Sequence, residues 1–187
     1  ENQMELFQVS KYLDVEHTIA KYMFDPVENP WEVLPSISIF IEQLGPMLPS
    51  EEFEQRGSNV WISKSAVIAP TAYIGGPCII DAGTEVRHCA FIRGSAIIGK
   101  NCVIGNSTEL KNVIIFDNVQ VPHYNYVGDS ILGFKSHMGA GSITSNVKSD
   151  KTLVHVKGMD PETNEKFDLE TGLKKFGAML GNHVEVG

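Results

Sequence analysis

The chain has 187 residues, of which 42% are hydrophobic and 20% charged, as in an ordinary folded protein with enough length for one core and an appendage. Its formal net charge of −8 argues against general binding to nucleic acids or anionic membranes, and no apolar run approaches the roughly 18 residues of a membrane span. Three cysteines without a CxxC pair fit a reducing compartment, so we expect a cytoplasmic protein.

Residues 1–57 are predicted to form an N-terminal helical cap. Apolar side chains recur at near-helical spacing over residues 31 to 44, and Gly45-Pro46 supplies a helix stop. A second, shorter helix is expected over residues 17 to 24. We expect the longer helix to cover the open end of the domain that follows.

Residues 58–187 are predicted to form a second domain built from a six-residue repeat. Every sixth residue from position 62 is aliphatic, and a small residue recurs two positions earlier. The aliphatic row is Ile62, Ile68, Ile74, Ile80, Val86, Ile92, Ile98, Ile104 and Leu110, and the small row is Ala66, Ala72, Cys78, Thr84, Ala90, Ala96, Cys102 and Thr108. A period of six predicts a triangular coil of short strands, with the aliphatic row inside and the small row at the corners.

The three cysteines are interpreted as packing residues. Cys78 and Cys102 belong to the small row, and Cys89 lies beside it. We therefore expect no reactive thiol.

The repeat loses its register after Leu110. The aliphatic row shifts by one residue at Ile115 and by one more at Leu132. Each shift changes which side chains face outward, where polar residues of stacked coils form columns about 4.8 Å apart. The disturbed stretch "ELKNVIIFDNVQVPHYNYVGDS" contains a lysine, a histidine and two tyrosines. We expect the functional residues in this stretch.

Two cations are predicted to form an anion site. Arg93 and Lys111 are 18 residues apart, which is three hexads and places them at equivalent corners of adjacent coils. Stacked cations repel each other unless an anion lies between them, and phosphate suits the planar fork of arginine and the point charge of lysine. The alternative is a pair of unrelated, solvated surface cations.

His123 is the candidate general base. It follows Pro122 in "PHYNY", and a neutral imidazole can accept a proton near neutral pH. The alternative is a hydrogen-bonded structural histidine.

Residues 148–177 are predicted to be an excursion from the coil. They are charged, contain Pro161 and Gly172, and carry no hexad, so we expect a hairpin with residues 152 to 156 as one arm. The hexad returns with Leu180 and Val186, and the chain stops within the pattern. Because the sequence also lacks an initiator methionine, we expect residues to be missing from one or both ends.

The repeat resembles the hexapeptide-repeat family, whose fold is a left-handed parallel β-helix and whose members are mostly trimeric acyltransferases. The segments "IRGS", "ELKN", "HYNYVGDS" and "GAGSITSN", in this order and spacing, resemble the acetyltransferase half of the bifunctional enzymes that make UDP-N-acetylglucosamine. They are also similar to stand-alone proteins related to UDP-N-acetylglucosamine pyrophosphorylase. The resemblance covers residues 58 to 146 and resumes at "KKFGAMLGNHVEVG". It implies a mainly β protein that forms a homotrimer.

The resemblance also implies an activity, which is the N-acetylation of glucosamine- or galactosamine-1-phosphate with acetyl-CoA as co-substrate and no metal. The implied general base is His123, which would deprotonate the sugar 2-amine, and the implied contact with the acetyl-CoA thioester is the backbone around Ala140. The implied substrate-binding residues are Arg93 and Lys111 for the phosphate and Tyr126, His137 and Asn146 for the sugar.

The chain departs from the family pattern at two of these places. His137 stands where the family has an asparagine, and Val147 stands where it has a tyrosine that helps hold the sugar. Residues 1–57 resemble no part of a uridylyltransferase, so we do not expect that second activity.

Two alternatives remain open. A γ-type carbonic anhydrase shares this architecture but needs three converging histidines, two of them five residues apart. The histidines of this chain provide no such pair: His17, His88, His123, His137, His155 and His183. The other alternative is a catalytically idle trimeric scaffold or a protein that binds a sugar phosphate or nucleotide sugar, and His137, Val147 and the excursion favour it.

Overall fold

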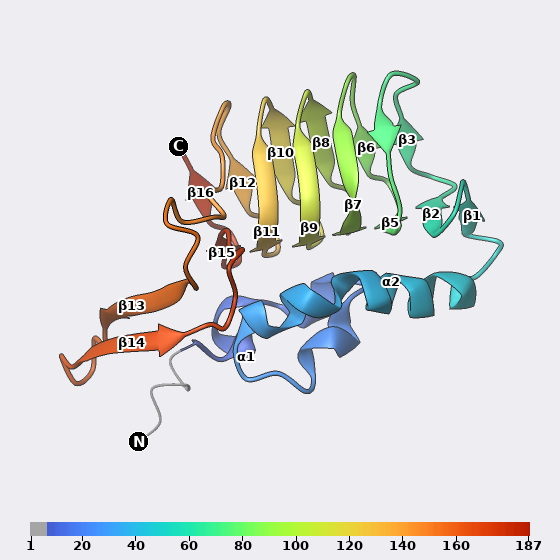
Figure 1. Cartoon of the computed structure of the whole chain (residues 1–187). Helices are drawn as coiled ribbons and strands as arrows, with labels where there is room; N and C mark the ends of the chain where they lie inside the picture. Colours follow the sequence, from blue (N-terminus) through green and yellow to red (C-terminus); the bar gives the residue numbers. More distant parts are fainter. Residues whose placement is uncertain (1–6) are drawn as a thin grey trace.

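The computed structural model describes residues 7–187 and shows a coil of short parallel strands with three faces (Figure 1). An 8-stranded sheet forms two of the faces and a 6-stranded sheet forms the third. The first sheet consists of β1 (Phe53–Gln55), β2 (Val60–Ser63), β4 (Tyr73–Ile74), β5 (Cys78–Ile80), β7 (Phe91–Ile98), β9 (Glu109–Ile115), β11 (Tyr126–Leu132) and β15 (Met179–Leu180). The second consists of β3 (Val67–Ile68), β6 (Glu85–Val86), β8 (Val103–Asn106), β10 (Gln120–His123), β12 (His137–Met138) and β16 (Glu185–Val186). The predicted mainly β fold, a parallel β-helix of hexapeptide repeats, is confirmed.

The predicted aliphatic row lies inside the coil. Ile80 pairs in register with Ile98, and Ile98 pairs with Ile115, which follows the first break in the repeat. All three side chains are fully buried. The break therefore leaves the interior stacking intact and changes only the path of the chain between two interior residues.

A second apolar ladder, which the repeat did not predict, lies on the outside of one face. It consists of the residues that directly precede interior residues, namely Trp61, Ile79, Ile97, Ile114, Ile131 and Met179. Ile79, Ile97 and Ile114 have no exposed surface. An apolar face of this size must be covered by another element, because apolar surface left in water is unfavourable.

The N-terminal segment, residues 7–52, covers this outer ladder. Figure 1 shows α2 (Ile37–Leu44) running along the flank of the coil, and α2 packs across β5, β7 and β9 with Ile37 and Ile41 buried. The prediction that the helix covers the open end of the coil is therefore wrong. The surface that most needs burial is the apolar flank, and the helix lies there.

The other helices of this segment are short. They are α1 (Val9–Tyr12), η2 (Val15–His17), η3 (Lys21–Phe24), η4 (Pro30–Ser36) and η5 (Gly45–Met47). The predicted helix over residues 31 to 44 begins as the 3-10 helix η4, because Pro35 has no N–H for an α-helical bond. The predicted helix over residues 17 to 24 is two 3-10 turns separated by the extended residue Thr18. None of the helices described over residues 7–187 is long and apolar enough to cross a membrane.

The predicted excursion is a hairpin of β13 (His155–Met159) and β14 (Lys166–Glu170). Its first strand starts at His155 rather than at residue 152. Phe167 anchors the hairpin to the N-terminal segment, with its ring centroid 5.4 Å from that of Phe7. At the base of the hairpin the Phe176 N–H donates to the Asn146 carbonyl at 2.9 Å, so the chain leaves and rejoins the coil at one corner.

The cysteines divide into two kinds. Cys78 and Cys102 are buried packing residues as predicted, and burial raises the pKa of each thiol to about 12. Cys89 is exposed at a corner with φ 58, so its interpretation as a packing residue is wrong. Its sulfur lies 3.3 Å from Nε2 of His88. At a corner, the side chain of the small row points inward and that of the residue before it points outward. Cys89 precedes the small residue Ala90, so its side chain lies on the outer side of the corner.

Candidate active site

The two breaks in the repeat produce two tight corners. Five residues, rather than six, separate the interior positions Leu110 and Ile115, and five also separate Val127 and Leu132. Asn112 and Asp129 adopt left-handed conformations at these corners, with φ 53 and φ 51, as Asn101 and Asn118 do at corners of regular spacing. Asparagine and aspartate tolerate this region better than most residues. The two breaks in the six-residue repeat thus mark corners that carry polar side chains.

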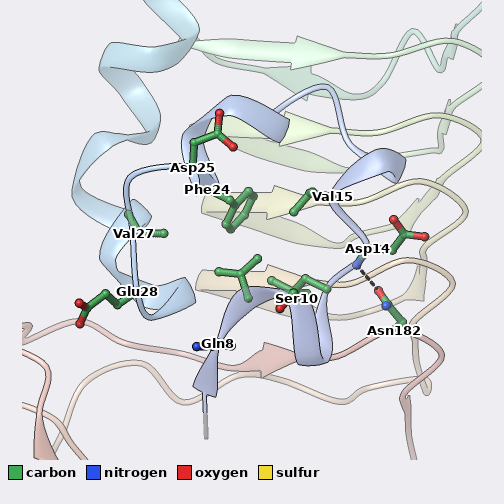
Figure 2. Close-up of a pocket in the computed structure, with 11 residues that line it drawn as sticks. Gln8, Ser10, Asp14, Val15, Phe24, Asp25, Val27, Glu28 and Asn182 are labelled. Atoms are coloured by element: carbon green, nitrogen blue, oxygen red, sulfur yellow. Dashed lines mark hydrogen bonds between the residues drawn. The ribbon is translucent and has the colours of Figure 1, made fainter. Parts of the chain in front are cut away.

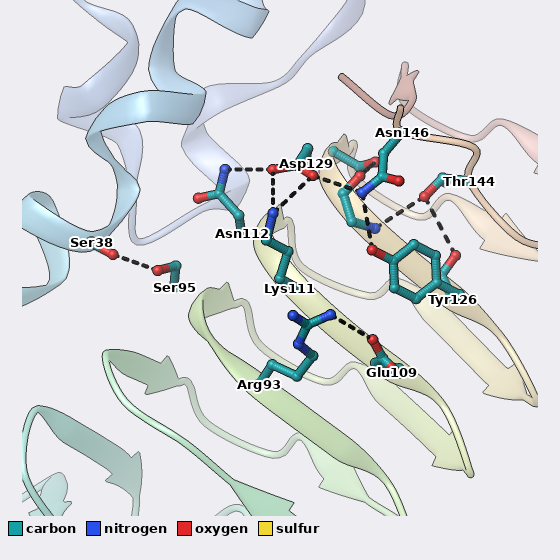
Figure 3. Close-up of polar contacts among 12 residues, drawn as sticks. Ser38, Arg93, Ser95, Glu109, Lys111, Asn112, Tyr126, Asp129, Thr144 and Asn146 are labelled. Atoms are coloured by element: carbon teal, nitrogen blue, oxygen red, sulfur yellow. Dashed lines mark hydrogen bonds and ion pairs between the residues drawn. The ribbon is translucent and has the colours of Figure 1, made fainter. Parts of the chain in front are cut away.

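A polar cluster surrounds the second of these corners (Figure 3). The Lys111 ammonium donates to both carboxylate oxygens of Asp129 at 3.2 Å, and Nδ2 of Asn112 donates to the same carboxylate at 3.0 Å. Nδ2 of Asn146 donates to Asp129 at 2.8 Å and to the Tyr126 hydroxyl at 3.0 Å. Three of the predicted substrate-binding residues, Lys111, Tyr126 and Asn146, are therefore in one hydrogen-bonded network.

A glycine leaves room for this network. A Cβ at Gly128 would lie 2.5 Å from the Tyr126 hydroxyl oxygen and 2.9 Å from Nδ2 of Asn146. Any other residue would push these two side chains apart.

Arg93 lies on the same face as Lys111 but in a bulge. The register between β7 and β9 shifts between Ile92 and Gly94, so Gly94 rather than Arg93 pairs with Lys111. The Arg93 guanidinium donates to Glu109 at 3.0 Å. The expectation that the two stacked cations need an anion between them is therefore wrong for the free chain, because each cation has its own carboxylate.

The remaining predicted residues line a different cavity, of about 320 Å³, on the face formed by the 6-stranded sheet. His123, at the end of β10, lines it together with His137 and Ala140. Arg87 lies at the same cavity and is held by Glu85, with Nε to Oε1 at 3.2 Å. The structure therefore brings the predicted base, the variant His137 and the predicted thioester contact into one space.

The amide nitrogen of Asn106, one coil earlier, lies 3.4 Å from Nδ1 of the His123 ring. An amide nitrogen donates, so in this orientation Nδ1 is the acceptor and the hydrogen of a neutral ring lies on Nε2. A half-turn of the Asn106 amide would present its oxygen to Nδ1, hold the hydrogen there and leave Nε2 free to accept a proton. The backbone of His123 is fixed as well, because its N–H donates to Oδ1 of Asn125 at 3.1 Å.

The backbone at Ala140 offers a hydrogen-bond donor. On either side, the Gly139 N–H donates to the Val186 carbonyl at 2.7 Å and the Gly141 N–H donates to the His123 carbonyl at 3.0 Å. The Ala140 N–H donates to no acceptor within residues 7–187. A donor of this kind can bind the oxygen of an incoming carbonyl group.

One chain does not assemble all the predicted residues in a single cavity. His123 and Tyr126 lie on opposite sides of the corner that contains Tyr124 and Asn125, and they belong to different sheets. The His123 cavity is lined by neither Arg93 nor Lys111. The site residues form two groups, one on each side of this corner.

Sequence reasoning missed several polar partners, namely Arg87, Asn106, Glu109, Asn112 and Asp129. Their signal was present in the spacing, since Asn106 precedes His123 by 17 residues and Asp129 follows Lys111 by 18, which is one coil in each case. Charged partners of this kind are found by reading the outward columns of the coil rather than its interior row.

Another cavity, of about 740 Å³, lies within the N-terminal segment (Figure 2). Phe24, Val15 and Val27 form apolar parts of its wall, and Asp25 and Glu28 lie at its rim. None of the predicted site residues lines it. Within residues 7–187, no group of three histidine, cysteine, aspartate or glutamate side chains is placed to hold a metal ion.

Comparisons with known proteins found a matching family model, relatives and a solved structure. A family model described as the GMPPB C-terminal domain matches residues 74–187. The bifunctional protein GlmU of Methanococcus maripaludis is 35% identical over 188 residues, which cover 98% of this chain and 43% of that protein. The bifunctional protein GlmU of Cyanothece sp. is 39% identical over 106 residues, which cover 55% of this chain and 22% of that protein. The acetyltransferase domain of PglB from Neisseria gonorrhoeae aligns with 45% of this chain and 42% of its own, at 17% identity and a TM-score of 0.43.

A coil of short parallel strands built on a six-residue repeat defines the class of the hexapeptide-repeat proteins. Within that class, this chain belongs to the family of GMPPB C-terminal domains, whose model matches more than half of its length. The chain spans less than half the length of the GlmU proteins that it matches.

Proposed function

We propose that the chain is an acetyl-CoA-dependent N-acetyltransferase acting on the 2-amine of an amino-sugar 1-phosphate, either glucosamine-1-phosphate or galactosamine-1-phosphate. The observation that carries the proposal is the cavity of about 320 Å³ lined by both His123 and Ala140. Acyl transfer to an amine needs a base for the amine proton and a donor for the developing oxyanion. A histidine side chain and a backbone N–H without an acceptor in residues 7–187 supply these two groups.

In the proposed reaction the amine nitrogen attacks the carbonyl carbon of the thioester. With the Asn106 amide turned so that its oxygen faces Nδ1, His123 accepts the proton from that nitrogen at Nε2, and the Ala140 N–H stabilises the oxyanion. The C=O bond then re-forms from the oxyanion as the C–S bond breaks, and the CoA sulfur leaves as a thiol with the proton from His123. A positioned base of this kind contributes roughly 10²–10⁴-fold to the rate.

Substrate binding is proposed to use both groups of residues. Arg93 and Lys111 would hold the phosphate, and Tyr126, His137 and Asn146 would hold the sugar. Because the two groups lie on opposite sides of a corner, we propose a homotrimer in which the His123 cavity of one chain faces the Lys111 cluster of its neighbour.

A second candidate function is an idle scaffold or a binding protein for a sugar phosphate or nucleotide sugar. The observation that favours it is that Arg93 and Lys111 are both paired with carboxylates. Val147, in place of a tyrosine, also lies at the base of the hairpin, where it pairs with Lys175 instead of reaching the network.

One assay separates these candidates. The protein is incubated with acetyl-CoA and each of the two amino-sugar phosphates, and release of free CoA thiol is followed together with the mass of the product. Saturable thiol release that depends on the amino sugar supports the transferase. Binding of the sugar phosphate without thiol release favours the scaffold, and neither binding nor release contradicts both.

A further inference from the structure

Asp129 is a buried carboxylate that no proposed catalytic step uses. Its side chain is 4% exposed, and it lies at the tight corner between the face that bears Lys111 and the face under α2. Its carboxylate accepts hydrogen bonds from three side chains on the coils before and after it, namely Lys111, Asn112 and Asn146 (Figure 3). A buried charge with this many donors is fully satisfied, so it has no capacity left for a ligand.

The corner itself does not require an aspartate. Asn112 and Asn146 precede and follow it on the adjacent coils, and Asn112 has the left-handed φ of 53, so an asparagine tolerates the conformation that Asp129 adopts. A third asparagine would continue the ladder without the desolvation cost of a charge. The one partner that needs a full negative charge is the Lys111 ammonium.

The pair fixes Lys111 and cancels its charge. Lys111 is 22% exposed and faces both oxygens of Asp129 at 3.2 Å, which leaves part of its ammonium open to a ligand in a defined direction. The neighbouring cation Arg93 is balanced by Glu109. The proposed phosphate site therefore has no net charge, which weakens its attraction for a small anion that makes no other contact.

We propose that Asp129 is a positioning residue that determines specificity, so that the site selects a phosphate attached to a sugar over free inorganic phosphate. This inference rests on the proposed function. A sugar phosphate gains additional contacts from Tyr126 and Asn146, which the same carboxylate holds in place, whereas inorganic phosphate has only the neutralised cations. Asp129 thus lowers the affinity for free inorganic phosphate and increases the ratio by which the site prefers the sugar phosphate.

The test compares wild type with Asp129→Asn at constant ionic strength. The KM for the amino-sugar phosphate should rise about tenfold, since a charge-assisted hydrogen bond that fixes Lys111 is lost. The inhibition constant of inorganic phosphate should fall several-fold, because the site gains one net positive charge. The KM for acetyl-CoA should stay within about twofold. A substitution that only disorders the site would weaken the binding of both ligands, and would raise both the KM for the sugar phosphate and the inhibition constant of phosphate. A rise in both constants, or an unchanged inhibition constant of phosphate, would therefore overturn the proposal.

Asp168→Asn is the matched control, because it removes a carboxylate from an exposed pair with His155 in the hairpin. It should behave as wild type. If Asp129→Asn does not fold, Lys111→Gln is compared with Lys111→Gln/Asp129→Asn. The double variant should have the lower KM for the sugar phosphate, because the single variant leaves an unpaired negative charge beside the ligand. Equal KM values would contradict the proposal.

The failure of the proposed function has a different signature. If wild type releases no thiol, calorimetric titration of wild type and Asp129→Asn with inorganic phosphate still measures the charge effect. Tighter binding by Asp129→Asn supports the role of Asp129 in anion selection, and equal binding overturns it.

Discussion

The imidazole ring of His17 stacks on the phenyl ring of Phe134, with centroids 3.8 Å apart and ring planes 9° apart. The backbone is joined at the same place, because the Asp117 N–H donates to the His17 carbonyl at 2.9 Å. Nδ1 of His17 also lies 3.7 Å from the Asp117 carboxylate. These contacts attach the N-terminal segment to two successive coils.

Replacing His17 with alanine should therefore destabilise the whole chain and not only its first residues. Loss of the stack should lower the free energy of unfolding by roughly 1 kcal/mol, measured from the midpoint of urea denaturation. His155→Ala, in the exposed hairpin, should change it by less than about 0.5 kcal/mol. Equal effects of the two substitutions would contradict the attachment.

The outer apolar ladder should contribute as much stability as an ordinary core. Ile97 is on the outside of its strand but fully buried under the N-terminal segment, so Ile97→Ala should cost about 2–5 kcal/mol. Val67 is the matched control, because it also faces outward from a strand but is 64% exposed. Val67→Ala should change the free energy of unfolding by no more than about 0.5 kcal/mol. Calorimetry or urea denaturation distinguishes these outcomes.

Asp81 should make stability depend on pH in a specific direction. Burial raises the pKa of the Asp81 carboxyl, against the opposing effects of the Ala82 N–H and Lys100. A carboxyl with a raised native pKa costs stability where it is ionised, and this cost disappears as the pH falls through that pKa towards the unfolded value of about 4.

Asp81→Asn keeps the acceptor for the Ala82 N–H, which is at 2.7 Å, and removes the charge. The variant should be more stable than wild type at about pH 7, with a difference that shrinks towards about pH 4. A gain of about 1 kcal/mol would raise Tm by roughly 2–4 °C in a chain of this size. A variant that melts below wild type at neutral pH would show that the charge is favourable where it lies.

The proposed base should affect turnover without affecting stability. His123→Ala should lower kcat by roughly 10²–10⁴-fold and leave the Tm and the KM for both substrates nearly unchanged, since the residue is exposed. His88 is a suitable control, because it lies on the same edge of the coil two turns earlier and far from Ala140 in the stack. Activity that survives in His123→Ala would remove the general base from the mechanism.

A site shared between chains should be restored by mixing two impaired variants. His123→Ala and Lys111→Gln carry defects in different groups, so a mixed trimer contains some interfaces with both residues intact. With random assembly, and at a sugar-phosphate concentration well below the KM of Lys111→Gln, co-refolded protein should regain about a quarter of the wild-type activity, while each variant alone stays far below that level. Sedimentation that shows a monomer, or mixing without recovery, would contradict a shared site.

The interior of the coil could be predicted from the sequence because its row of aliphatic residues has a fixed period. The side chains of Ile80, Ile98 and Ile115 stack even though the connection before Ile115 is one residue shorter, so the aliphatic row could still be followed through the break. The outer ladder was missed because the sequence does not show whether the outer side of a strand is covered by another element. An aliphatic residue on that side is compatible with both a covered and an exposed strand. That omission also led to the wrong position for α2.

The sequence suggested candidate site residues but could not show how they are arranged. A period of 18 residues correctly put Arg93 and Lys111 on one face, yet the bulge after Ile92 and the corners at Asn112 and Asp129 alter the register by single residues. A shift of this size decides which carboxylate meets which cation. Spacing alone therefore could not show that both cations are already neutralised.

The N-terminal segment contacts the coil at two places that are several turns apart. The Asn182 N–H donates to the Tyr12 carbonyl at 2.8 Å, and Gly45 lies against the Trp61 ring, where even a methyl group would clash. A solenoid can gain or lose turns during evolution, but a turn inserted between these two places would separate the attachment points by one strand spacing. The length of the N-terminal segment therefore limits how many turns can lie between Trp61 and Asn182.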